Sequence, residues 1–191
     1  VFQGEEIGMT NVDYQELSDF RDVEVFTEYK NFMSLGATHE VAMQALRDRS
    51  RDNARSPFQW DSSKNGGFSE VTPWMNSVKN YKEINLEQQK KDPNSLFNTY
   101  KSIFKMRKDE LINNGDITFL DIDHEDSYTY INETEKSKFL VIANFRNVKI
   151  SLSLDIDIAN YKNIYYNYSV RELTNDLELK PYEALVYKLD K

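Results

Sequence analysis

The residues best suited to chemistry lie in residues 49–68, where arginines gather close to an aromatic ring. Arg49, Arg51 and Arg55 fall within one short stretch, and Trp60 follows them. The planar guanidinium group of arginine binds pairs of neighbouring oxygens and stacks on aromatic rings. A tryptophan ring offers an amphipathic surface that suits polyol ligands. These residue types indicate a loop that lines a site for an oxygen-rich ligand.

A structural interpretation of the same segment has equal weight on these residues alone. Asp48, Asp52 and Asp61 lie among the arginines, and ion pairs within the loop would occupy the guanidinium groups without any ligand. Trp74, which follows Pro73, is interpreted as a hydrophobic plug that holds the loop. The residue types leave open whether the loop is rigid scaffolding or lines a ligand site.

Two pairs of carboxylates are weaker candidates. Glu5 and Glu6 lie at the end of a strand predicted within residues 1–8. Paired carboxylates can act as acid and base, but neighbours on a strand point to opposite faces, so we expect one buried Glu and one solvated Glu. Asp22 and Glu24 lie at the start of a predicted helix, where acidic residues complement the helix dipole. Taken alone, neither pair is predicted to be a catalytic site.

The composition excludes several classes of function. The formal net charge of −8 argues against a nucleic-acid partner, and no apolar run approaches the roughly 20 residues that span a bilayer, so no membrane partner is expected. The chain contains no cysteine, which favours a reducing, cytoplasmic compartment. His39 and His124 are too few for a histidine-rich metal site, and no nucleotide or dinucleotide motif occurs. We therefore expect no metal and no cofactor.

The first part of the chain is predicted to be helical with long loops. The expected elements are helices over residues 17–35, 39–49 and 93–111, with an irregular segment over residues 50–91. Asp92 and Pro93 are predicted to be the N-cap and first residue of the last of these helices, whose apolar face includes Leu111. Residues 113–115 are expected to end it. The length of the irregular segment favours a functional loop.

After residue 115 the pattern changes to short strands. They are predicted over residues 117–122, 127–132, 138–145, 150–154, 163–170 and 184–189. Their regular spacing and polar turns predict an antiparallel β-sandwich. The strand that contains Tyr165, Tyr166 and Tyr168 leaves open an alternative function, a carbohydrate-binding or structural module without catalytic activity.

Five segments of the sequence resemble one family of enzymes. They are FQGEEIGMTN (2–11), FRDVEV (20–25), RDNARSPFQWD (51–61), TPWMNSVKNYKEIN (72–85) and PYEALVYKL (181–189). In this order they resemble the oligo-1,6-glucosidase branch of glycoside hydrolase family 13. That branch includes α-glucosidases, dextran glucosidases, trehalose-6-phosphate hydrolases and sucrose isomerases. The resemblance covers nearly the whole chain, and the third segment is its most specific part.

The resemblance implies a fold, because members of this family carry a (β/α)₈ barrel whose active site lies at the C-terminal ends of the strands. The chain is expected to be the C-terminal portion of such a protein. By resemblance, residues 1–6 end the eighth barrel strand, and residues 9–91 form the long loop and small helices that overlie the active-site mouth. Residues 93–111 form the eighth helix, and residues 116–191 form an antiparallel β domain. The implied domain division is 1–112 and 113–191.

The resemblance also implies which residues act. The nucleophile Asp, the acid/base Glu and a third Asp of this retaining family come from earlier strands, so the chain is expected to hold no catalytic residue, and Glu5 and Glu6 do not replace them. Arg51 is the first candidate for substrate binding, and Glu24 is implied on the acceptor side. Arg55 is expected to brace the loop and is also a substrate-binding candidate, within reach of the sugar. The implied ligand is a short α-linked oligosaccharide or disaccharide, and the implied partner is the remainder of the barrel.

One residue departs from the family pattern. Phe58 stands where Met or Val is more usual, which weakens any choice among members of the branch. Trehalose-6-phosphate hydrolase and sucrose isomerase therefore remain alternatives to an oligo-1,6-glucosidase. A non-enzymatic, transporter-associated relative is also formally open.

Overall fold

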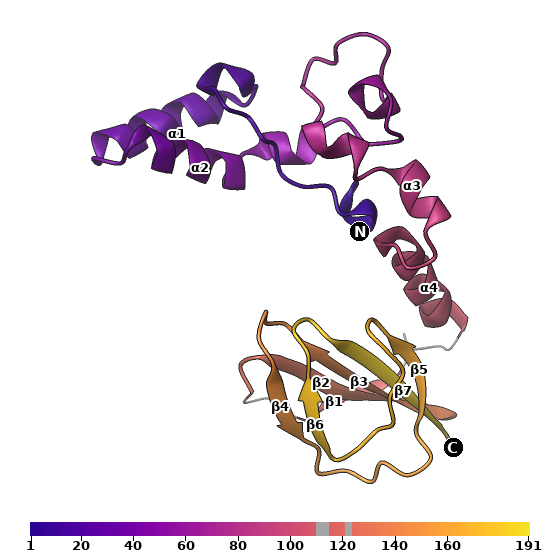
Figure 1. Cartoon of the computed structure of the whole chain (residues 1–191). Helices are drawn as coiled ribbons and strands as arrows, with labels where there is room; N and C mark the ends of the chain where they lie inside the picture. The colour runs from indigo at the N-terminus through magenta and orange to yellow at the C-terminus, as the bar shows by residue number, and fades with distance from the viewer. Residues whose placement is uncertain (110–114, 121–123) are drawn as a thin grey trace. The chain divides into compact units, whose positions relative to one another are not determined.

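The computed structural model describes residues 1–109, 115–120 and 124–191 and divides into two compact units, Val1–Ile103 and Phe104–Lys191 (Figure 1). The first unit is built from helices and loops, and the second from antiparallel strands. The predicted change from helical to β structure is therefore present. The predicted domain boundary after residue 112 falls outside the described residues and stays a prediction.

Two helices, α1 (Val23–Ser34) and α2 (His39–Arg49), form the first part of the helical unit. Helix α2 begins after Thr38, whose hydroxyl accepts the backbone N–H of Val41, and it has the predicted bounds. The two helices bury a shared apolar cluster, which is made of Val12, Tyr14, Phe20, Val25, Met43 and Leu46.

The single helix expected over residues 17–35 is wrong in its first part. A short 3₁₀ helix covers Leu17–Asp19, and Phe20 follows in an extended conformation with its ring buried. Asp22 is also extended, and its carboxylate accepts the backbone N–H of Glu24, so helix α1 begins only after it. N-capping by Asp22 therefore overrides the helical spacing of the apolar residues.

The prediction of a strand over residues 1–6 is also wrong. A 3₁₀ helix covers Glu5–Ile7, between Gly4 and Gly8 in the left-handed region, and Ile7 is buried. Glu5 is exposed and Glu6 is half-buried, and the two carboxylates accept the backbone N–H groups of Phe2 and Gly4. A strand requires a hydrogen-bonded neighbour, and the described residues of this unit contain no strand to pair with it.

The segment over residues 50–91 contains a series of short helices, which agrees with the small helices implied by the resemblance. They are 3₁₀ helices at Arg51–Arg55, Lys64–Gly67 and Lys79–Lys82, and helix α3 at Leu86–Lys91. The first N–H groups of α3 donate to the backbone carbonyls of Gln59 and Trp60, and Asn85 caps the same end. These bonds fix the residues after the arginine cluster to a helix far along the chain.

Helix α4 (Leu96–Asp109) begins later than predicted. Asp92 ends α3, and its carboxylate accepts the backbone N–H of Asn94, so it is not available to cap α4. At the start of α4 the backbone N–H of Phe97 instead donates to Gln89 Oε1, and that of Asn98 donates to Ser95 Oγ. The predicted end of this helix, with Leu111 and residues 113–114, lies outside the described residues.

The second unit is an antiparallel sandwich. Its strands are β1 (Asp116–Phe119), β2 (Ser127–Glu133), β3 (Ser137–Asn144), β4 (Ile150–Ser153), β5 (Lys162–Tyr166), β6 (Asp176–Leu179) and β7 (Ala184–Asp190). A five-stranded sheet has the order β1-β2-β3-β7-β5, and β4 pairs with β6 in a two-stranded sheet. Side chains of both sheets share one core, including Leu140, Ile142, Leu152, Leu179 and Leu185.

Strand β6 is absent from the sequence prediction. It is short and carries Asp176 and Glu178, and only Leu177 and Leu179 face the core. Its residues do not favour a strand by themselves, and the strand forms because it pairs with β4, with Ile150 opposite Leu179. Apolar and polar residues alternate along β4, and its isoleucine and leucine are buried whereas its serines are exposed.

We predict that Leu152→Ala destabilises the chain by about 2–5 kcal/mol, because it removes a buried side chain shared by both sheets. Ser151→Ala, on the opposite face of the same strand, is the control and should change the free energy of unfolding by less than about 0.5 kcal/mol. Urea unfolding followed by circular dichroism measures both. Equal midpoints for the two variants would contradict this register.

Candidate functional site

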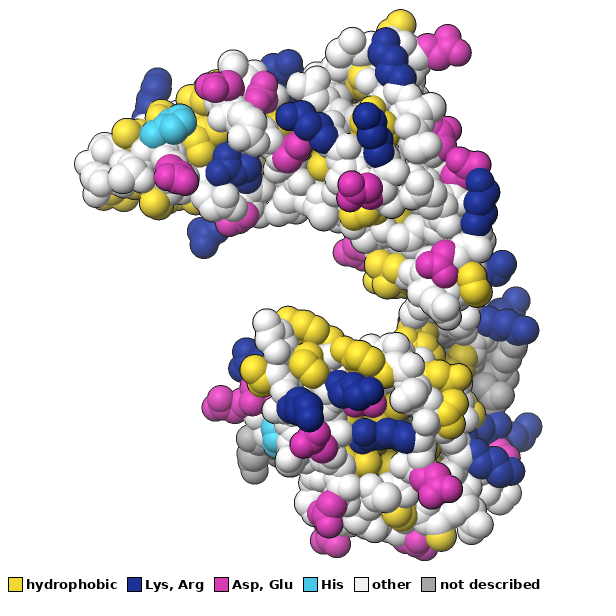
Figure 2. All heavy atoms as spheres, viewed as in Figure 1, with side chains coloured by type: hydrophobic (Ala, Val, Ile, Leu, Met, Phe, Trp, Pro, Cys, Tyr) yellow, Lys and Arg dark blue, Asp and Glu magenta, His cyan; other side chains and the backbone are white. Residues whose placement is uncertain are grey.

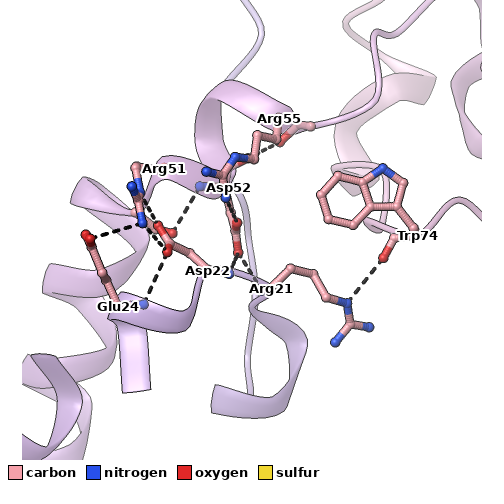
Figure 3. A network of polar contacts seen from close by, with 9 residues as sticks. Arg21, Asp22, Glu24, Arg51, Asp52, Arg55 and Trp74 are labelled. Carbon is pink, nitrogen blue, oxygen red and sulfur yellow. Dashed lines mark hydrogen bonds and ion pairs between the residues drawn. The ribbon is translucent and has the colours of Figure 1, made fainter. Parts of the chain in front are cut away.

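The arginine cluster centres on a two-bond ion pair between Arg51 and Asp22 (Figure 3). Arg51 Nε donates to Asp22 Oδ2 and Arg51 Nη2 donates to Asp22 Oδ1, both at 2.7 Å. Parallel bonds of this kind fix the plane of the guanidinium group as well as its position. The 3₁₀ helix Arg51–Arg55 supplies the arginine, and the residue before α1 supplies the carboxylate.

The two partners have very different exposure. Asp22 is 4% exposed, whereas the side chain of Arg51 is 53% exposed and that of Glu24 is 66% exposed. Glu24 Oε1 lies 3.2 Å from Arg51 Nη2, so two carboxylates share one guanidinium. A donor group and an acceptor group therefore lie side by side where solvent reaches both. This is the arrangement that binds hydroxyl groups, since a hydroxyl donates and accepts.

The electrostatics follow from these contacts. Hydrogen bonding from Arg51 lowers the pKa of Asp22 from 3.8 to about 2, against the opposing effect of burial. The bonds to Asp22, together with the charges of Asp22 and Glu24, raise the pKa of Arg51 above its usual value. The guanidinium of Arg51 therefore lies between the carboxylates of Asp22 and Glu24.

Asp52 was predicted only as one of the possible ion-pair partners within the loop, and the structure gives it further contacts. It is fully buried, and its Oδ2 accepts the backbone N–H groups of Arg21, at 2.7 Å, and Asp22, at 3.3 Å. Its own N–H donates to Ser50 Oγ. Asp52 thus joins the turn that carries Arg51 to the residue that binds Arg51. Its position beside Arg51 was visible in the sequence, but the partner some thirty positions away was not.

The structure brings Arg51 and Glu24 together and places Arg55 on the other side of the turn. Arg55 Nη1 lies 3.5 Å from Asp52 Oδ1, which agrees with a bracing position. Ion pairs do hold the loop, as the structural interpretation expected, but Arg51 finds its partners outside it. Of the two other acids of the loop, Asp48 accepts a bond from Gln44 and Asp61 binds Ser63.

One of the two tryptophans differs from expectation. Trp74 is 67% exposed, so it is not the predicted plug, and the neighbouring Met75 is buried in its place. The backbone carbonyl of Trp74 accepts a bond from Arg21 Nε at 3.2 Å, which ties this loop to the site (Figure 3). Trp60 contacts Phe58 edge to face at 4.7 Å, but half of its surface stays exposed.

A cavity of about 250 Å³ lies next to the same turn. It is lined by residues 2–5 and by Met9, Thr10, Asn11, Asn53, Ala54 and Ser56. Arg51, Glu24 and Arg55 are not among the described residues that form these walls. The exposed donor on the turn and the exposed acceptor on α1 therefore lie outside this cavity.

The wider surface offers no strong field of one sign on the face in view. Figure 2 shows basic and acidic side chains interspersed over both units. Within residues 1–109, 115–120 and 124–191, no helix is long and apolar enough to cross a membrane. The same residues contain no cluster of three or more His, Asp or Glu arranged to hold a metal ion.

Comparison with known proteins places this chain in a family. Residues 1–115 match the alpha amylase catalytic domain. Since the match covers more than half of the chain, the chain belongs to the alpha-amylase family. The resemblance to the oligo-1,6-glucosidase branch is confirmed by the relatives below.

The relatives are similar over the whole chain. The oligo-1,6-glucosidase of Halalkalibacterium halodurans is 35% identical, with 98% of this chain and 34% of that protein covered. The crystal structure of trehalose-6-phosphate hydrolase from Bacillus licheniformis is 37% identical with a TM-score of 0.93, covering 100% of this chain and 36% of that one. Isomaltulose synthase from Erwinia rhapontici is 37% identical with a TM-score of 0.87, covering 100% and 35%. The chain spans about a third of the length of these relatives.

We predict that Asp22 titrates near pH 2 in the folded chain and at a higher pH in an Arg51→Gln variant, because the guanidinium stabilises the charged carboxylate. The pKa is lower in the folded state, so the ion pair contributes fully to stability above about pH 3.8, and this contribution is lost as the pH falls through about 2. NMR titration of the carboxyl carbon measures both proteins. Equal pKa values in the two would contradict the pairing.

Proposed function

We propose that the chain is the C-terminal part of a retaining α-glucoside hydrolase of the oligo-1,6-glucosidase type, acting on short α-glucosides in carbohydrate metabolism. In this proposal residues 1–112 are the end of the catalytic (β/α)₈ barrel with its substrate-binding loop, and residues 113–191 are the C-terminal β domain. The nucleophile Asp, the acid/base Glu and the third Asp lie upstream of Val1. A cytoplasmic location belongs to the same proposal.

The observation that carries the proposal is the exposed pair of Arg51 and Glu24 on its buried support. A sugar ring presents neighbouring hydroxyls, each of which accepts a bond from a guanidinium N–H and donates one to a carboxylate. Arg51 and Glu24 bind and orient the glucoside, and Arg55 braces the turn through Asp52. The names of the relatives, which include an oligo-1,6-glucosidase and a trehalose-6-phosphate hydrolase, support the same class of substrate.

The chemical step belongs to the remainder of the barrel. A retaining glycosidase needs two carboxyl groups about 5–5.5 Å apart, one to attack and one to protonate the leaving oxygen. Glu5 and Glu6 are each bonded to nearby backbone N–H groups and have no such arrangement. This chain therefore contributes substrate binding rather than bond cleavage.

An exposed group of aromatic rings on the β unit supports a partner for that unit. Tyr128 contacts Phe119 at 5.2 Å and Phe145 at 5.8 Å between ring centroids, and all three rings are exposed. Contiguous exposed apolar surface of this kind marks interaction sites. In the proposal, the remainder of the catalytic barrel is the partner of the chain.

Trehalose-6-phosphate hydrolase and sucrose isomerase are the second candidates, and they are favoured by the high similarity to solved structures with these activities. A carbohydrate-binding module is less well supported. The hydroxyl of Tyr168 donates to the backbone of Pro181, and Lys180 lies 5.0 Å from the centre of its ring, so groups of the chain itself already occupy this tyrosine. Assays on isomaltose, trehalose-6-phosphate and sucrose separate the enzyme candidates.

We predict that Arg51→Ala lowers kcat/KM of the complete protein for isomaltose or p-nitrophenyl α-glucoside by about 10- to 100-fold, because it removes charge-assisted hydrogen bonds to the sugar. Arg49→Ala is the matched control, since this exposed arginine ends α2 and lies outside the binding pair. It should leave kcat/KM within about twofold. Unchanged kinetics in Arg51→Ala would exclude Arg51 from substrate binding.

A further inference from the structure

We propose that Asp22 is a positioning residue that fixes the donor and the acceptor of the sugar-binding pair at the same time. This inference rests on the proposed function and deepens it. Asp22 accepts two bonds from the side chain of Arg51 and one, at 3.2 Å, from the backbone N–H of Glu24. One buried carboxylate therefore fixes the positions of both exposed groups.

The hydrogen bonds of Arg51 show which edge it presents. A guanidinium group has five N–H donors. Nε and Nη2 bond to Asp22, and Nη2 also lies within ion-pair distance of Glu24 Oε1. Nη1 has no acceptor among the described residues, and neither does Glu24 Oε2 have a donor. These two atoms remain for two hydroxyl groups of one ligand.

The position of Asp22 is itself fixed by a buried residue. Its backbone N–H donates to the fully buried Asp52, and the same Asp52 oxygen accepts the N–H of Arg21. Asp52 therefore fixes the position of Asp22, and Asp22 in turn fixes the positions of the exposed Arg51 and Glu24. Long exposed side chains normally lose rotamer freedom when they bind, and an arrangement fixed beforehand reduces that cost.

The substitution Asp22→Asn separates positioning from helix capping. Asparagine caps helices about as well as aspartate, so the bond to the N–H of Glu24 is kept. The amide has only one acceptor oxygen, and its NH₂ group faces a guanidinium donor, so the two parallel bonds to Arg51 cannot both form. The variant keeps the shape of the side chain and removes the fixed orientation of Arg51.

The first test is a double-mutant cycle on the complete protein with isomaltose. Asp22→Asn should lower kcat/KM about tenfold, and adding it to Arg51→Ala should cause almost no further loss, because Asp22 acts through Arg51. Additive losses, or an unchanged kcat/KM in Asp22→Asn, would overturn the proposal. Asp126→Asn, which removes the partner of Arg146 in the β unit, is the matched ion-pair control and should leave activity unchanged.

The second test does not depend on activity. The Nε–H signal of Arg51 should be resolved and slow to exchange with solvent in the NMR spectrum of the native protein, and should be lost in Asp22→Asn, with the urea midpoint reporting that the variant is folded. A signal that persists in the folded variant overturns the positioning role. A native protein without activity on any α-glucoside, but with this protected signal, instead contradicts the proposed function alone.

Discussion

Reciprocal hydrogen bonds between two segments far apart in the sequence hold the helical unit together. Asp52 accepts the backbone N–H groups of Arg21 and Asp22, and Arg51, its neighbour, donates twice to the carboxylate of Asp22. Each piece thus satisfies buried polar groups of the other. Removing one member of such a set leaves a buried charge or donor unpaired, which costs far more than a surface ion pair contributes.

The position of the exposed groups follows from this constraint. Asp22 ends the extended segment before α1 and caps that helix, so its location sets where the first turn of α1 and Glu24 lie. Ser50 and Ser56 hold the backbone of Asp52 from either side, which fixes the turn that carries Arg51. The β unit has its own core between two sheets and carries no part of this network.

Local patterns predicted the regular elements well and the special residues poorly. The bounds of α2 and the alternation of β4 follow from the order of apolar and polar residues, and the structure shows both. Asp92 was misassigned as the N-cap because its carboxylate accepts the backbone N–H of Asn94, before α4 begins, and its own backbone ends α3. Strand β6 was missed since its order comes from pairing with β4.

The candidate site was predictable in part. The arginine cluster and the family resemblance pointed to Arg51, Glu24 and Arg55, and the structure brings the first two into contact. The roles of Asp22 and Asp52 were not predictable, because they depend on burial and on partners about thirty positions away in the chain. An aspartate before a helix looks the same in the sequence whether it only caps the helix or also holds an arginine.

The most direct test of this account is a crystal structure of the complete protein with a bound, uncleaved short α-glucoside. The account predicts that Arg51 Nη1 and a Glu24 carboxylate oxygen lie within about 3 Å of hydroxyl groups of one glucosyl ring, and that both bonds between Arg51 and Asp22 are retained. A glucoside bound out of reach of Arg51, or an Arg51 that leaves Asp22 when the sugar binds, would contradict it.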